Sequence, residues 1–148
     1  MLFLRQLSLL HFKNYRRQSF SFTEPVVCLC GLNGTGKTTV LDAIHFLCFT
    51  KSYFLHQDIQ AVTVGEAGMR LAGTFAGEPN EEVVFILREN GKKEFSCGGE
   101  AYARFSQHIG RFPCVFISPD DTELISGGSE LRRKFLDVLI SQTDPAYM

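Results

Sequence analysis

Residues 31–38 read Gly-Leu-Asn-Gly-Thr-Gly-Lys-Thr, a complete match to the phosphate-binding pattern G-x-x-x-x-G-K-[S/T]. The motif constrains the fold because it is expected as a loop between a strand and a helix. Its glycines let backbone amides approach phosphate oxygens, its lysine reaches the β- and γ-phosphates, and its threonine hydroxyl binds Mg²⁺. The expected nucleotide-binding residues are Gly31, Leu32, Asn33, Gly34, Thr35, Gly36, Lys37, Thr38 and Thr39, with Thr38 also the expected Mg²⁺ ligand.

Both flanks of the motif suit this arrangement. Residues 26–30 (Val-Val-Cys-Leu-Cys) are apolar and β-prone, which predicts a strand. Residues 39–49 carry apolar side chains at helical spacing, which predicts a helix with its N-terminus aimed at the anion. The combination favours nucleotide binding over a plain glycine turn.

Composition narrows the remaining choices. A chain of 148 residues fits one domain, and its net charge of −1 provides no overall field for nucleic acid, although a local basic patch can still bind it. The five cysteines form no C-x-x-C pair, which is typical of reduced, mostly buried thiols in a cytosolic protein. The sequence has no signal-peptide pattern and no apolar stretch near the ~20 residues that cross a bilayer. We therefore expect a cytoplasmic protein without a membrane partner.

The rest of the chain predicts a mixed α/β fold with antiparallel strands beside a phosphate-loop core. This order departs from the regular βαβ repeat. Besides the strand before the motif, predicted strands cover residues 2–12, 19–22, 69–76, 82–88, 93–96 and 113–117, with turns at 14–17 and at Asn90-Gly91. Predicted helices cover residues 39–49, 101–109 and 130–141, the last with Ser129 as its N-cap.

Four segments carry a resemblance to a known family. They are the L-x-L-x-x-F-x-N-Y-R pattern of residues 7–16, the phosphate loop with its helix, Lys51-Ser52-Tyr53, and residues 117–137. The last segment is the most specific, because it joins a Ser-Pro-Asp turn, a glycine pair, an Arg-Arg pair and Phe-Leu-Asp. In this order and spacing they resemble the RecF family of bacterial recombination mediators, relatives of SMC and ABC-type ATPases.

The resemblance implies an ABC/SMC-like ATPase head lobe with an antiparallel β subdomain. It divides the chain into an ATP-binding lobe, residues 1–118, and the start of a helical lobe, residues 119–148. It implies ATP and Mg²⁺ as cofactors and an ATP-dependent homodimer in the full-length protein. It also implies roles in DNA repair, replication and the SOS response. The implied partners are single-stranded DNA, linear or gapped double-stranded DNA, and other recombination mediator proteins.

The family pattern also includes an ABC-type signature and a Walker B strand, and neither follows the matched segments. We therefore expect the N-terminal part of a longer RecF-like protein, which binds ATP but turns it over negligibly. Residues 126–130 mimic a signature, but a helix-opening motif is the alternative. Asp120 and Asp121 follow an apolar segment as Walker B carboxylates would, but the intervening Ser-Pro favours a capped turn.

Several basic residues have two interpretations. In the related ATPases a loop at the place of Asn14 and Arg16 approaches the nucleotide, and the alternative here is an exposed basic turn. Scattered residues could form a patch that contacts DNA phosphates, with a tyrosine to stack on a base. The residues of this patch are Lys13, Arg16, Arg17, Lys51 and Tyr53. Arg132 and Arg133 on the last helix either contact DNA or the missing half, or lie on a solvated face.

Two further functional classes stay open. One is a stand-alone phosphotransferase that uses Asp120 or Asp121 to hold Mg²⁺. The other is a non-catalytic DNA- or partner-binding module with a vestigial phosphate loop. The four histidines show no metal-ligand spacing, and no Ser-His-Asp set stands out.

Overall fold

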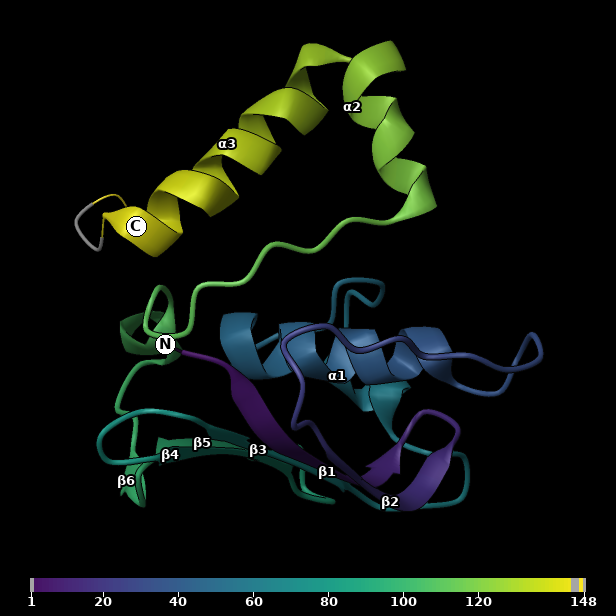
Figure 1. The fold of residues 1–148 in the computed structure, drawn as a ribbon, viewed down its shortest axis with the longest axis vertical. Coiled ribbons are helices and arrows are strands. Elements are labelled where there is room, and N and C mark those ends of the chain that lie inside the picture. The colour runs from purple at the N-terminus through teal and green to yellow at the C-terminus, as the bar shows by residue number, and fades with distance from the viewer. Residues whose placement is uncertain (1, 145–146, 148) are drawn as a thin grey trace.

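The computed structural model describes residues 2–144 and 147, and its centre is a six-stranded antiparallel sheet in the order β2-β1-β3-β4-β5-β6. Helix α1 lies across one face of the sheet (Figure 1). The strands are β1 (Leu4–Phe12), β2 (Tyr15–Ser21), β3 (Met69–Phe75), β4 (Glu81–Leu87), β5 (Lys93–Cys97) and β6 (Glu100–Ala101). The helices are α1 (Lys37–Phe49), α2 (Glu123–Ser126) and α3 (Ser129–Thr143), with short 3₁₀ turns at Asp58–Ala61, Phe105–His108 and Pro119–Thr122.

The connection between β2 and β3 positions the phosphate loop. The chain leaves β2, forms the loop at residues 31–36, and returns through α1 to pair β3 with β1. The β1–β2 hairpin turns at Lys13 and Asn14, because Phe12 pairs with Tyr15. This turn and the N-terminus of α1 consequently meet at one end of the molecule.

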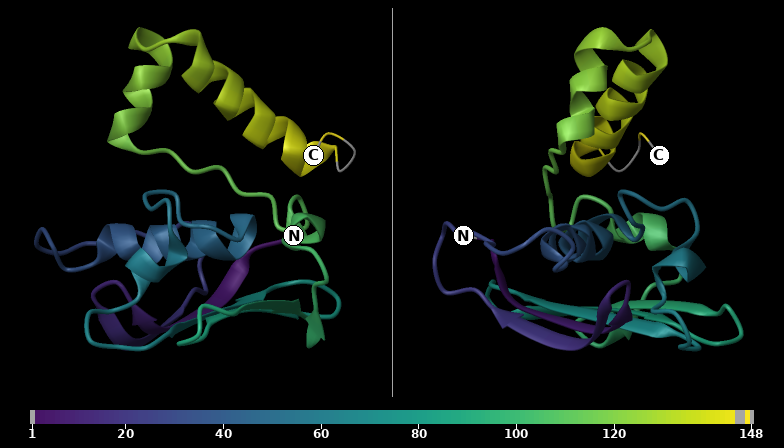
Figure 2. Two further views of the ribbon diagram at one scale, coloured as in Figure 1. Left: turned by 180° about the vertical axis from the view of Figure 1, so that it is seen from behind. Right: turned by 90° about the vertical axis from the view of Figure 1, so that its right-hand side faces the viewer.

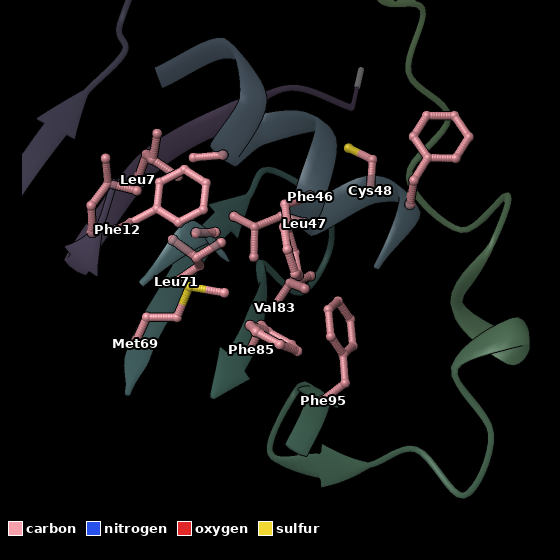
Figure 3. Packing of buried hydrophobic residues seen from close by; sticks show 14 of the residues in the cluster. Leu7, Phe12, Phe46, Leu47, Cys48, Met69, Leu71, Val83, Phe85 and Phe95 are labelled. Carbon is pink, nitrogen blue, oxygen red and sulfur yellow. The ribbon is translucent and has the colours of Figure 1, made fainter. Parts of the chain in front are cut away.

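The core fills the space between α1 and the sheet (Figure 3). Phe46 of α1 is fully buried and contacts two other aromatic rings, with centroid distances of 6.3 Å to Phe12 and 4.6 Å to Phe85. On β3, Leu71 faces the core while Arg70 stays partly exposed, as expected for a sheet covered on one face. The burial of these apolar side chains is the main force that holds α1 on the sheet.

Most of the hairpins and the helix after the phosphate loop agree with the sequence-based predictions. Two predicted strands do not form. Residues 26–30 and 113–117 belong to no strand and no helix of the described chain. Val26 is 85% exposed and Val115 71% exposed, so both segments carry apolar side chains outside the core. A strand needs a hydrogen-bonded neighbour, and within the described residues no strand pairs with either segment.

Smaller corrections concern turns and caps. Strand β2 already begins at Tyr15, so the predicted turn at 14–17 is shorter and Arg16 and Arg17 lie on the strand. The predicted helix at 101–109 is instead the end of β6 followed by the 3₁₀ turn, because Tyr102 N–H continues the hairpin to Phe95 O at 2.9 Å. Helix α3 begins at Ser129 with Gly128 as its N-cap.

The segment after residue 112 stands apart from the sheet. Figure 2 shows α2 and α3 on the side of α1 away from the sheet. We call residues 113–143 the arm and residues 2–112 the body. In the part of the chain that the structure describes, no helix is long and apolar enough to cross a bilayer.

Candidate nucleotide-binding site

The phosphate loop has the backbone conformation that its glycines allow. Gly34 and Gly36 have φ angles of 80° and 99°, in the left-handed region that side chains disfavour. Gly36 is also the N-cap of α1, and a Cβ there would lie 2.5 Å from Asn14 Nδ2 and 2.8 Å from the Tyr15 ring. Glycine at position 36 is therefore required both by its φ angle and by the closeness of the β1–β2 turn.

A cavity of about 380 Å³ opens at the N-terminus of α1. It is lined by Lys13, Asn14, Asn33, Gly34, Gly36, Lys37, Thr38 and Thr39. The first amides of a helix have no acceptor within the helix, and the helix dipole favours an anion at this end. The cavity thus has the position, the amide donors and the lysine that phosphate binding requires.

Lys37 is held by the loop itself. Its ammonium donates to the carbonyls of Gly31 at 2.9 Å and Leu32 at 2.7 Å. The Thr35 hydroxyl donates to the same Leu32 carbonyl at 2.9 Å and stiffens the loop. Neutral carbonyls are weaker partners for an ammonium than phosphate oxygens, so a bound phosphate would compete well for Lys37.

Thr38 and Thr39 differ in what their hydroxyls can do. Thr38 is exposed, and no group in the described part of the chain hydrogen-bonds its hydroxyl, which leaves this oxygen available to a Mg²⁺ ion. Thr39 is buried, and its hydroxyl donates to Asn14 Oδ1 at 2.9 Å. The donor set therefore fits Mg²⁺ at Thr38, while Thr39 joins the helix to the β1–β2 turn.

Asp42 of α1 is a residue that the sequence analysis missed. Its carboxylate is fully buried and accepts three bonds, from Lys13 Nζ at 2.6 Å, the Ser52 hydroxyl at 2.8 Å and Tyr53 N–H at 2.7 Å. A buried carboxylate is tolerated only with such partners. The available sequence signal was an acidic residue inside the apolar pattern of the helix. Asp42 fixes the turn and residues 51–53 beside the cavity.

The predicted DNA-contacting residues fall into separate groups. The Lys13 ammonium and the Tyr53 N–H both bond the Asp42 carboxylate. The Lys13 ammonium also lies 5.2 Å from the Phe54 ring centre. Arg16, Arg17 and Lys51 are exposed, and no direct contact joins them to that pair among the described residues.

On the arm, Arg132 and Arg133 have different environments. Arg132 donates to the carbonyls of Leu124 at 3.2 Å and Gly127 at 2.9 Å. These bonds close the turn between α2 and α3, so Arg132 has a structural role. Arg133 is exposed on α3. Residues 126–130 comprise the last residue of α2, the α2–α3 turn and the first two residues of α3.

Asp121 caps a turn, which agrees with the capped-turn interpretation for this residue. Its carboxylate accepts the Ser118 N–H and the Tyr53 hydroxyl, each at 2.5 Å. The bond from Tyr53 holds the pKa of Asp121 below its usual value, and burial together with this bond raises the pKa of Tyr53. Asp120 is exposed at the start of the same turn.

Comparison with known proteins gives consistent matches over nearly the whole chain. The family model described as AAA domain matches residues 6–138. The "DNA replication and repair protein RecF" of Cytophaga hutchinsonii is 40% identical over 99% of this chain, and that of Flavobacterium johnsoniae 43% over 98%. The chain spans 39% and 41% of the length of these two relatives.

Solved structures agree with the sequence matches. The structure of the recombination mediator protein RecF-ATPrS matches this chain with a TM-score of 0.92 at 30% identity. The match covers 99% of this chain and 40% of the RecF chain. An SMC ATPase structure has a TM-score of 0.72 at 18% identity, over 93% of this chain and 99% of that one. The second match shows a shared fold alone, and together they confirm the predicted ABC/SMC-like head fold.

Proposed function

We propose, from the premise that this chain belongs to the AAA domain family, that it binds ATP with Mg²⁺ at the cavity before α1. The observation that carries the proposal is the loop at Gly36, where neither the φ angle nor the neighbouring Asn14 and Tyr15 leave room for a side chain. A loop so restricted presents its amides to an anion at the helix N-terminus. A solved RecF structure whose description names ATP supports ATP as the nucleotide.

Each residue of the cavity has one task in this proposal. The loop amides and the α1 N-terminus receive the phosphates, and Lys37 exchanges the carbonyls of Gly31 and Leu32 for phosphate oxygens. Thr38 holds Mg²⁺ through its hydroxyl, and the ion neutralises phosphate charge when bound. The Thr39–Asn14 bond keeps the β1–β2 turn against the loop.

Efficient hydrolysis needs a carboxylate that holds Mg²⁺ and a group that orients the attacking water. The residues that line the cavity in the described chain include no carboxylate. Asp121 is committed to Ser118 and Tyr53. We therefore expect ATP binding with negligible turnover by this chain alone.

The activity of a longer protein is proposed from the relatives named as DNA replication and repair proteins. In such a protein this chain supplies the ATP-binding lobe, residues 1–118, and the start of a helical lobe, residues 119–148. ATP bound between two copies would favour a homodimer and change its affinity for DNA, because a ligand shifts an equilibrium only by its different affinity for the two states. Single- or double-stranded DNA, other recombination mediators and a cytoplasmic location belong to the same proposal.

The first test is calorimetric titration of the chain with ATP and Mg²⁺. Lys37→Ala should weaken binding by about tenfold to a hundredfold, the value of a lost charge-assisted bond. Lys92→Ala is the matched control, since it removes the same charge from a side chain 66% exposed on the β4–β5 turn. Equal affinity of the wild-type chain and a folded Lys37→Ala chain would contradict the proposal.

A further inference from the structure

Cys28 and Cys30 form a close pair of thiols just before the phosphate loop. Their sulfur atoms are 3.3 Å apart, and both side chains are exposed. Leu29 between them packs against the core. Leu29 therefore faces the core, whereas both thiols face solvent side by side.

Closing a disulfide requires the backbone of this segment to bring the two sulfurs into bonding distance. A disulfide requires a sulfur separation of about 2.05 Å and Cα atoms no more than about 6.8 Å apart. A residue pair two apart in a sheet is held extended by ladder bonds on both sides. Residues 26–30 have no such ladder in the described chain, so no ladder bond opposes the bend that closure needs.

The segment is joined directly to the nucleotide site. Cys30 precedes Gly31, and the Gly31 carbonyl is one of the two acceptors that hold Lys37. A bend at residues 28–30 would therefore reorient the first peptide of the loop and the carbonyl that Lys37 contacts.

We propose that Cys28 and Cys30 are a redox-modification site, at which exchange with a small-molecule disulfide closes a reversible disulfide that weakens ATP binding. Oxidised glutathione is a representative of the oxidant class. The effect on ATP rests on the proposed function, whereas formation of the disulfide does not.

The chemistry balances without a metal or cofactor. A thiolate of the pair attacks one sulfur of the oxidant RSSR, the S–S bond breaks, and RS⁻ leaves with the proton that the thiol gave up. The second thiolate attacks the protein sulfur of this mixed disulfide and expels a second RS⁻. Two protein thiols are oxidised, and one RSSR becomes two RSH.

The other cysteines are less accessible to this reaction. Cys48 and Cys97 are buried and Cys114 is half-buried. The hydrogen bond with Cys114, with burial, raises the pKa of the Cys48 thiol strongly. The hydrogen bond with Cys30 raises the pKa of the Cys28 thiol.

The test is incubation of the chain with oxidised glutathione, followed by blocking of free thiols and peptide mapping by mass spectrometry. Cleavage after Lys and Arg leaves both cysteines in the peptide 18–37, while Cys48 and Cys114 fall in the peptides 38–51 and 112–132. A Cys28–Cys30 disulfide therefore lowers the mass of one peptide by two hydrogen atoms, whereas a Cys48–Cys114 disulfide links two peptides. We expect the first product before any other, and reversal by dithiothreitol.

The effect of the disulfide on ATP binding, which we call the coupling, is measured by ATP titration of the oxidised and the reduced chain. The Cys28→Ser/Cys30→Ser variant is the control that cannot close the disulfide. We expect the dissociation constant to rise by about tenfold on oxidation of the wild-type chain only. By reciprocity, saturating ATP should shift the equilibrium with oxidised glutathione toward the reduced pair of thiols by the same factor.

Different failures overturn different statements. Peptide 18–37 with both thiols free or both carrying glutathione would overturn the modification site. A closed disulfide with unchanged ATP affinity would overturn the coupling. Absence of ATP binding by the reduced chain would overturn the proposed function and, with it, the coupling, whereas the closed disulfide would still support the modification site.

Discussion

The body and the arm carry similar apolar side chains but bury them very differently. In the body, Phe46 is fully buried between α1 and the sheet. In the arm, Phe135 is 43% exposed, and no described residue of α3 is buried. The comparison teaches that a helical pattern of apolar residues suffices to predict a helix, whereas a core needs a second surface that faces it.

Local side-chain contacts hold the arm on the body. The Phe116 ring stacks near Tyr53, with centroids 4.4 Å apart, and the Tyr53 hydroxyl donates to Asp121. Within the arm itself, the Cys114 N–H donates to Gln142 Oε1 at 2.8 Å, which ties the end of α3 to the start of the arm. These contacts involve a few side chains rather than a continuous apolar layer, so we expect the arm to open at lower free energy than the body.

The largest expected effect comes from the same substitution made in each region. Phe46→Ala should lower the free energy of unfolding by about 3–5 kcal/mol, because it leaves a cavity in the core. Phe135→Ala should lower it by less than about 1 kcal/mol, since its ring already meets solvent. Urea unfolding followed by circular dichroism measures both. Equal losses would mean that α3 packs as tightly as α1.

An intermediate effect on the free energy of unfolding is expected from pH, through two histidines of the body. One lies inside the body, and the other lies where the arm contacts it. Burial lowers the pKa of His108 and of His45 below 6.5. His108 Nε2 lies 2.7 Å from Leu47 O inside the body, whereas the His45 ring lies 5.6 Å from that of Phe116 in the arm. The unfolded chain binds these protons more readily, so the stabilisation is complete above pH 6.5 and is lost as pH falls toward the folded pKa values.

Urea midpoints measured between about pH 5 and pH 8 should therefore rise with pH. Carboxylates such as Glu94, whose pKa is lowered to about 2 by the bond from Arg88, titrate outside this window. His108→Gln keeps a donor toward Leu47 O without a titrating ring, and should flatten the slope. An unchanged slope in this variant would assign the pH dependence to other groups.

The smallest effect on global stability is expected from Tyr53→Phe, which removes the bond to Asp121 and keeps the ring beside Phe116. The free energy of unfolding should change by no more than about 1 kcal/mol, the value of one partly exposed hydrogen bond. Amide hydrogen exchange should nevertheless quicken in residues 113–126 and stay unchanged in α1. Faster exchange throughout the body would show that the two regions unfold as one unit.

Local sequence signals predicted much of the body. The Asn90-Gly91 hairpin, strands β3 to β5 and helix α1 follow from turn chemistry and periodicity, which act over a few neighbouring residues. The phosphate loop was predictable for the same reason, since its residues are consecutive. Residues 26–30 and 113–117 were predicted as strands from the same kind of signal, and they belong to no strand of the described chain.

Consecutive residues alone thus determined the glycine loop, its lysine and the helix behind it. Only the tertiary structure brought the β1–β2 turn onto Gly36, paired Lys13 with Asp42, and bonded Arg132 to the carbonyls of the α2–α3 turn. Chain geometry links nearest neighbours directly, whereas such contacts depend on how distant elements pack, and packing energy is spread over many residues that no short pattern contains.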